Sequence, residues 1–270
     1  MLVKIAKKVL PEGRLRNTLK SLYHDYRFLK VFYGRNKEFD IRYDKADDLY
    51  QFRFKSGPLK GIELNFPGNL HKTSFFEIPT VLEGYFSSFE PRQDDIIIDA
   101  GAFPGDFAVA AAKMKVKKVL ALEPDPKNRS YLESMIKSNN IQDRIIVLPY
   151  ALSDKNDFSH LSQNYSGSRI SDIPSPEMIP VETKTLDTLI SKMGIGSERI
   201  IIKMDIEGAE LKAVDGASKM INMGAEFIIA SYHMVKGRKT AETLRNVFQN
   251  RGYNVFSHYP KHLTLVAKPF

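Results

Sequence analysis

Residues 96–108 read IIIDAGAFPGDFA, an apolar run followed by an aspartate and a turn that carries two glycines. The apolar run is typical of a strand that is buried on both faces of a parallel sheet. Gly101 and Gly105 would let the backbone turn sharply and approach a ligand closely. A helix is expected from about residue 106, so its N-terminus would face that ligand. This stretch therefore predicts a strand, a ligand-binding loop and a helix.

The same alternation of short apolar runs and helical stretches continues to the C-terminus. The expected strands are 96–99, 119–123, 145–149, 200–205, 227–231, 253–257 and 262–267, and the expected helices are 106–114, 127–139, 209–222 and 239–251. This alternation predicts an α/β fold with a mostly parallel sheet. The tight connection around Pro260 predicts an antiparallel finish. Residues 154–180, rich in Ser, Asp, Asn and Pro, are expected to form an inserted loop, with a short strand at 178–184.

The N-terminal part of the chain differs in charge. Residues 1–37 carry ten Lys and Arg against two acids, whereas residues 38–270 carry thirty of each sign, so the net charge of +8 lies in the first segment. Amphipathic helices are expected at 2–10 and 14–33. They could pack on the main body, or they could bind an anionic membrane surface or an acidic polymer through residues 1–37.

We therefore predict three segments. They are a basic helical arm (1–45), a lead-in with a hairpin at 48–66 and a helix at 75–89 (46–90), and a ligand-binding α/β domain (91–270). The absence of Cys excludes disulfides and thiolate zinc sites. No apolar run approaches the roughly 20 residues that span a bilayer, and no signal peptide is recognised. A cytoplasmic protein is expected, which the arm could hold at the inner face of the membrane.

Polar residues follow or close most of the expected strands, where ligands bind in open α/β sheets. These residues are Asp99, Glu123, Tyr150, Asp205 and 231–233. The dinucleotide fingerprint and the Walker A loop are both absent. An acid at the head of the loop disfavours a phosphate ligand and suits a cationic or hydroxyl-bearing one. S-adenosylmethionine fits, because it carries an ammonium and a sulfonium but no phosphate. Glu123 could accept its ribose hydroxyls, or it could only cap the next helix.

Residues 74–235 resemble the FkbM family of S-adenosylmethionine-dependent methyltransferases. The resemblance is carried, in family order, by IIIDAGAFPGDFA (96–108), VLALEPDP (119–126), YALSD (150–154), VETKTLDTLI (181–190) and IIKMDIEGAE (201–210). It implies a class I methyltransferase fold, which is a Rossmann-like, mostly parallel seven-stranded sheet with an antiparallel last strand. The sequence departs from the family at Phe103, where Asn is usual, and at Ser231, where Glu often precedes the histidine.

We assign the cofactor to residues at and beyond the strand ends. They are Asp99, Gly101, Ala102, Gly105, Phe107, Glu123, Pro124, Tyr150, Ala151 and Asp205. The resemblance implies transfer of the methyl group to a hydroxyl, which requires a base. The candidates are Asp205, Glu207 and His233. Alternatively, Asp205 could bind the cofactor or cap a helix, Glu207 could only form the turn, and His233 could be a loop histidine. No metal is expected; if one binds, its ligands would be Asp205, Glu210 and His233.

The resemblance implies an O-methyltransferase, and we expect it to act on a saccharide, a lipid-linked sugar or glycolipid, or a small metabolite. Two alternatives stay open. An RNA ribose methyltransferase would use the basic arm to hold its substrate. Nucleic acid is the less favoured partner, since the Asn/Asp-Pro-Pro-aromatic segment that base-amine methylases use does not follow the strand at 200–205, but an RNA ribose target stays open. A non-catalytic protein would keep the fold only for binding.

Overall fold

A computed structural model describes residues 39–68, 74–164, 167–193, 198–235, 237–258 and 263–270. The helices predicted at 2–10 and 14–33 lie outside these residues. The centre of the molecule is a seven-stranded sheet in the order β15-β16-β12-β11-β4-β5-β6. Its strands are β4 (Ile96–Ala100), β5 (Lys118–Leu122), β6 (Ile145–Leu148), β11 (Ile200–Met204), β12 (Glu226–Ala230), β15 (Tyr253–His258) and β16 (Thr264–Pro269).

All seven strands were predicted, and their directions agree with the prediction. Neighbours from β6 to β12 pair in parallel, whereas β16 pairs antiparallel with both β12 and β15. The last strand is thus the reversed one. The chain continues from β4 to β5 on one side of β4 and later returns to β11 on the other side of β4. The strand order therefore reverses between β4 and β11. Such a switch point is where ligands bind in doubly wound sheets.

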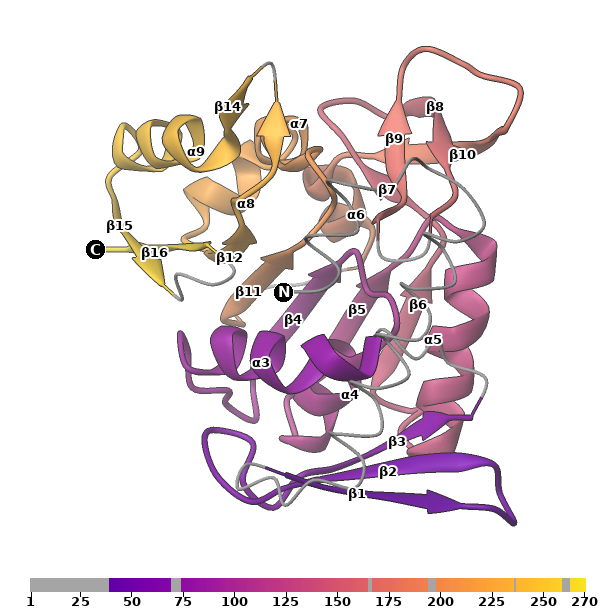
Figure 1. Ribbon diagram of the computed structural model, residues 1–270. Helices are drawn as coiled ribbons and strands as arrows, with labels where there is room; N and C mark the ends of the chain where they lie inside the picture. The colour runs from indigo at the N-terminus through magenta and orange to yellow at the C-terminus, as the bar shows by residue number, and fades with distance from the viewer. Residues whose placement is uncertain (1–38, 69–73, 165–166, 194–197, 236, 259–262) are drawn as a thin grey trace, which may run out of the picture.

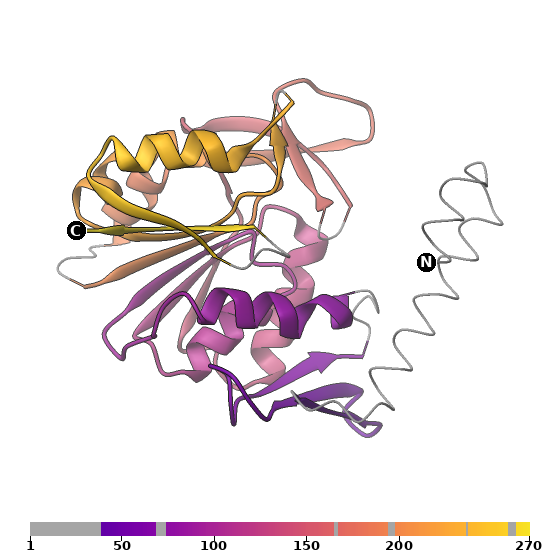
Figure 2. The same ribbon diagram turned by 60° about the vertical axis from the view of Figure 1, so that its left-hand side comes forward.

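Helices cover both faces of the sheet, with α9 on one side and α3, α4 and α5 on the other (Figures 1 and 2). Alternate strand residues supply the two cores: Ile97 and Ile201 belong to the cluster under α4 and α5, whereas Ile98 and Ile202 belong to the cluster with α9. The helices are α3 (Ser74–Phe86), α4 (Asp106–Lys113), α5 (Pro126–Ser138), α6 (Leu186–Met193), α7 (Glu210–Asp215), α8 (Ser218–Asn222) and α9 (Thr240–Gln249).

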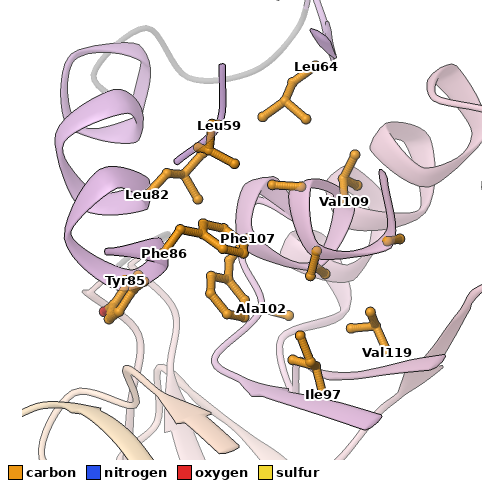
Figure 3. Close-up of a cluster of buried hydrophobic side chains, with 14 of the residues drawn as sticks. Leu59, Leu64, Leu82, Tyr85, Phe86, Ile97, Ala102, Phe107, Val109 and Val119 are labelled. Carbon is orange, nitrogen blue, oxygen red and sulfur yellow. The ribbon is translucent and has the colours of Figure 1, made fainter. Parts of the chain in front are cut away.

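The predicted hairpin and helix of the lead-in are both present, and they pack on the main sheet layer. β1 (Phe39–Asp44), β2 (Leu49–Phe54) and β3 (Glu63–Pro67) form an antiparallel sheet. Figure 3 shows Leu59 and Leu64 of this region and Leu82 and Phe86 of α3 in one cluster with Phe107 of α4. The rings of Phe86 and Phe107 stack with centroids 4.9 Å apart. The lead-in therefore completes the core on the α4 side.

The end of the segment predicted as a helical arm forms a strand instead. Phe39 is buried and Ile41 half-buried, whereas Asp40 and Arg42 are exposed. This period of two suits a half-buried strand, and β2 supplies its hydrogen-bonding partner.

The prediction of an inserted loop at 154–180 was wrong in part. This region forms strands of a four-stranded sheet in the order β7-β10-β8-β9. The strands are β7 (Ala151–Leu152), β8 (Asp157–Ser162), β9 (Arg169–Ser171) and β10 (Met178–Lys184), and β10 confirms the short strand predicted at 178–184. Ala151, Leu161 and Val181 give this sheet a small apolar core. Its abundance of Ser, Asp and Asn hid the strand periodicity.

The helix predicted at 209–222 is divided into α7 and α8 near Gly216. A Cβ atom at Gly216 would lie 2.3 Å from the backbone oxygen of Ser153, which follows β7, so the chain approaches Ser153 too closely for any side chain. A short hairpin of β13 (Met234–Val235) and β14 (Arg238–Lys239) precedes α9. None of the described helices combines the length and apolar character needed to cross a membrane.

Candidate functional site

The loop between β4 and α4 is held against the ends of two neighbouring strands. The N–H groups of Gly101 and Ala102 both donate to the backbone oxygen of Leu122, at 3.0 and 3.1 Å. Gly101 has φ of 74°, and a Cβ there would lie 2.0 Å from the backbone oxygen of Asp205. Only glycine meets both conditions, since an L side chain disfavours this backbone conformation and would collide with the backbone of Asp205, just after β11.

Replacement of Gly101 by alanine tests this close approach. We expect Gly101→Ala to lower the free energy of unfolding by about 2 kcal/mol or more, because backbone strain and collision act together. Gly61→Ala is the matched control: Gly61 has φ of 85°, but nothing lies within 4 Å of a Cβ there. That control should lose only about 1–2 kcal/mol to strain. Urea unfolding measures both, and equal losses would contradict the collision.

Glu123 follows β5 and faces the same loop. Its carboxylate accepts hydrogen bonds from the N–H of Phe103 at 3.2 Å and from the N–H of Asp125 at 3.0 Å. The residue is buried. Burial raises the pKa of Glu123 to about 7, although the backbone hydrogen bonds lower it. A carboxylate fixed in this way keeps lone pairs for hydroxyl groups of a ligand.

Behind the loop lies a buried pair of opposite charges. Lys203, the fourth residue of β11, places its Nζ 2.9 Å from Asp99 Oδ1 and donates at 2.9 Å to the backbone oxygen of Gly101. Burial raises the pKa of Asp99, although Lys203 lowers it. Asp106, at the start of α4, lies nearby; burial raises its pKa to about 7, and Lys203 opposes this. Lys203 is thus the cation that compensates a group of buried acids.

The strand ends enclose a cavity of about 300 Å³, which we call the strand-end cavity. Seven of the ten residues assigned to the cofactor line it, namely Gly101, Phe107, Glu123, Pro124, Tyr150, Ala151 and Asp205. Asp99, Ala102 and Gly105 are absent from the lining. Asp99 has no exposed surface and pairs with Lys203, which does line the cavity. Direct contact of Asp99 with a ligand was predicted. In the structure, its partner Lys203 is the residue that reaches the cavity.

Asp205 follows β11 and is held by two tyrosines. Tyr85 of α3 donates to Oδ2 at 3.0 Å, and Tyr232, which follows β12, donates to Oδ1 at 3.3 Å. Both tyrosines line the strand-end cavity with Asp205. Burial raises the pKa of Asp205, although Lys203 and His233 lower it. The carboxylate is therefore oriented at the cavity wall by side chains from two further elements.

The three candidate catalytic residues lie together. His233 Nε2 is 3.6 Å from Asp205 Oδ1 and 3.5 Å from Glu207 Oε1, while His233 Nδ1 is 2.8 Å from Glu210 Oε1. Burial lowers the pKa of His233, but contacts with Glu207 and Glu210 outweigh it and raise the pKa to about 10. We call Asp205, Glu207 and His233 the acid–histidine cluster.

The ligand set predicted for a metal requires a correction. That set contained Glu210, but the donor atoms that lie within 4.8 Å of one another belong to Asp205, Glu207 and His233. Glu210 begins α7 and contacts the opposite nitrogen of the imidazole. The turn at Glu207, where φ is 56°, carries the chain round so that Glu207 and Glu210 approach different ring atoms.

Ser231, noted as a departure from the family, is no part of the cavity wall. Its hydroxyl donates to the backbone oxygen of Leu263 at 2.9 Å. Phe103, the other departure, does line the cavity.

Sequence analysis missed Lys203, Tyr85 and Asp106. A lysine inside the buried run IIIKMD was a usable signal, because a charge in a strand covered on both faces needs a partner. The sequence places Tyr85 only within the helix predicted at 75–89. Its hydroxyl contact with Asp205 spans 120 residues of sequence, and no local pattern encodes that distance.

Comparison with known proteins gives a family and a fold. The family model described as the methyltransferase FkbM domain matches residues 99–255, more than half of the chain. Among curated proteins, no sequence matches significantly. A solved structure of methyltransferase FkbM from Methylobacillus flagellatus KT is 18% identical with a TM-score of 0.50, covering 73% of this chain and 54% of that one. The chain thus spans about half the length of that protein, and the likeness shows a shared fold.

Two further solved structures are similar at lower scores. An O-methyltransferase family protein from Burkholderia thailandensis is 10% identical with a TM-score of 0.45, covering 73% of this chain and 58% of that one. A Streptococcus mutans protein solved in complex with SAH is 14% identical with a TM-score of 0.43, covering 71% and 97%.

Proposed function

This chain belongs to the methyltransferase FkbM family, and on that premise we propose that it transfers a methyl group from S-adenosylmethionine to a hydroxyl of a saccharide, a lipid-linked sugar or a small metabolite. The observation that carries the proposal is the position of the acid–histidine cluster. Both of its carboxylates, Asp205 and Glu207, line the same cavity as Gly101 of the glycine loop and Glu123. Cofactor-binding and proton-accepting groups therefore share one cavity.

The residues around the cavity fit S-adenosylmethionine. The volume of about 300 Å³ lies at the lower end of the range for small-ligand sites, about 300–1,000 Å³. Glu123 offers an oriented carboxylate for the ribose hydroxyls, and Gly101 brings backbone to the cavity wall. Lys203 neutralises Asp99 behind that wall. A bound cofactor would supply a methyl group on a positively charged sulfur, and loss of that methyl group to an acceptor oxygen would leave neutral S-adenosylhomocysteine.

The chain's own task is then to orient the acceptor and to take its proton. An alcohol is a weak nucleophile until its proton leaves, and a positioned base contributes about 10²–10⁴ in rate. Asp205 suits this role because it lines the cavity and Tyr85 and Tyr232 hold both of its oxygens. The imidazole of His233 is absent from the lining of the cavity, and its Nδ1 lies 2.8 Å from Glu210 Oε1. This supports a carboxylate, and not the imidazole, as the proton acceptor.

Cofactor binding should depend on pH through Glu123. With a pKa of about 7, Glu123 is charged above neutrality and accepts hydroxyl hydrogen bonds, whereas protonation below neutrality removes that capacity. We expect the affinity for S-adenosylmethionine to rise about tenfold from pH 6 to pH 8, following the charged fraction of such a group. Isothermal titration calorimetry at several pH values measures it.

The controls are two glutamine variants. Glu123→Gln should bind the cofactor at least about tenfold more weakly, with no such pH dependence. Glu133→Gln, on the exposed side of α5, should behave as the wild type. A wild-type protein that binds no S-adenosylmethionine at any pH would overturn the proposed function.

A further inference from the structure

We infer that the acid–histidine cluster is a binding site for a divalent cation at the wall of the strand-end cavity. Asp205 follows β11, Glu207 lies in the turn before α7, and His233 follows β12. The fold brings one donor atom of each residue within 4.8 Å of the other two. Two carboxylate oxygens and an imidazole nitrogen are common ligands of divalent metals.

His233 provides the second observation that indicates a ligand. The side chain is 4% exposed, and its Nε2 makes no hydrogen bond. That nitrogen faces Asp205 Oδ1 at 3.6 Å and Glu207 Oε1 at 3.5 Å. Donors that share a cation at about 2.1 Å are separated by about 3.0–3.5 Å. These two separations are close to the upper end of that range, so a small adjustment of the side chains would let the three donors share one cation.

Each of the three residues is also oriented by a contact on its far side. Glu210 Oε1 lies 2.8 Å from His233 Nδ1 and is itself fixed by the N–H groups of Ile206 and Gly208, at 3.2 and 3.3 Å. Tyr85 donates to Asp205 Oδ2, the oxygen that does not face the imidazole. Arg169 donates to Glu207 Oε2, again the oxygen turned away from His233. Metal ligands are held in this way by outer partners, among which a carboxylate behind a histidine is frequent.

The donor set indicates the class of cation and of acceptor. Carboxylates suit Mg²⁺ and Mn²⁺, and imidazole favours transition metals, so Mn²⁺ satisfies both preferences. Three protein donors leave about three positions of an octahedral ion open. Asp205 and Glu207 line the cavity, so these positions would face an acceptor with two neighbouring oxygens, such as a sugar diol. This last step rests on the proposed function: the cation would lower the pKa of the bound hydroxyl and so help Asp205 to take its proton.

Titration of the full chain with MnCl₂, followed by the electron paramagnetic resonance signal of free Mn²⁺, tests the site without any assay of activity. We expect one bound ion per chain in the wild type. Glu207→Gln and His233→Gln should each weaken binding at least about tenfold because each loses one ligand. Glu210→Gln should weaken it by about 10–100-fold through the imidazole. Asp40→Asn, an exposed carboxylate on β1, should bind as the wild type does.

Circular dichroism identifies which variants keep the fold. The test needs only one folded variant among Glu207→Gln and His233→Gln. Wild-type protein that binds no Mn²⁺ at millimolar concentration, or a folded Glu207→Gln variant that binds equally well, would overturn the inference. Binding of S-adenosylmethionine is measured separately on the same samples. Binding of Mn²⁺ without binding of S-adenosylmethionine would contradict only the proposed function. Binding of S-adenosylmethionine without binding of Mn²⁺ would contradict only the cation site.

Discussion

Asp205→Asn should lower the rate of methyl transfer by about 100-fold or more while changing the affinity for S-adenosylmethionine by less than about threefold. Asparagine has nearly the shape of aspartate, so Tyr85 still has an oxygen to which it can donate. The negative charge is lost, however, and with it both the capacity to accept a proton and an anionic oxygen for a cation.

Two measurements on the same protein separate the roles of Asp205. The initial rate of label transfer from methyl-labelled S-adenosylmethionine reports the reaction, and calorimetry reports cofactor binding. Asp40→Asn serves as the control because that carboxylate is exposed on β1, outside the cavity. If rate and affinity fall together, Asp205 acts by binding the cofactor, which is the alternative left open by the sequence.

Lys203→Met should lower the free energy of unfolding by about 3–5 kcal/mol at neutral pH. The substitution removes the positive charge that compensates Asp99, whose side chain is completely buried. It also removes the hydrogen bond to the backbone oxygen of Gly101. A buried carboxylate without a partner is costly, whereas removal of both charges can be close to neutral.

The double variant Lys203→Met with Asp99→Asn distinguishes the charge effect from simple loss of packing. We expect it to recover at least about half of the loss seen in Lys203→Met, because the buried carboxylate that pairs directly with Lys203 is then also removed. Urea unfolding of the wild type, both single variants and the double variant completes the cycle. A loss below about 1 kcal/mol for Lys203→Met would contradict the account of the pair.

The sheet could be predicted because its strands are buried on both faces. Runs such as IIID at 96–99 are apolar throughout, and this signal does not depend on any partner. The four-stranded sheet that contains β8 and β10 could not be predicted equally well, since its apolar core consists of few residues, with Ala151, Leu161 and Val181 at its centre. Its outer positions carry the Ser and Asp that also mark loops.

The cavity residues also divide into those that the sequence could predict and those that it could not. Glu123 and Asp205 could be predicted from their place after apolar runs, because the ends of parallel strands lie at one edge of the sheet. The partners that orient the acids could not be predicted. Tyr85, which donates to Asp205, and Arg169, which donates to Glu207, come from segments whose positions depend on the complete fold. Glu207, and not the predicted Glu210, lies beside His233 Nε2, and this depends on the backbone turn at Glu207, where φ is 56°.

Transfer of label from methyl-labelled S-adenosylmethionine tests the central claim most directly. The full chain is incubated with a lysate of the organism that encodes it, with Mn²⁺ present, and saccharide, lipid, metabolite, RNA and protein fractions are then separated. The account predicts label in the saccharide, lipid or metabolite fraction with the wild type and almost none with Glu123→Gln or Asp205→Asn. Label in RNA alone would contradict the proposed acceptor. The absence of label from every fraction, together with a lack of cofactor binding, would contradict methyl transfer itself.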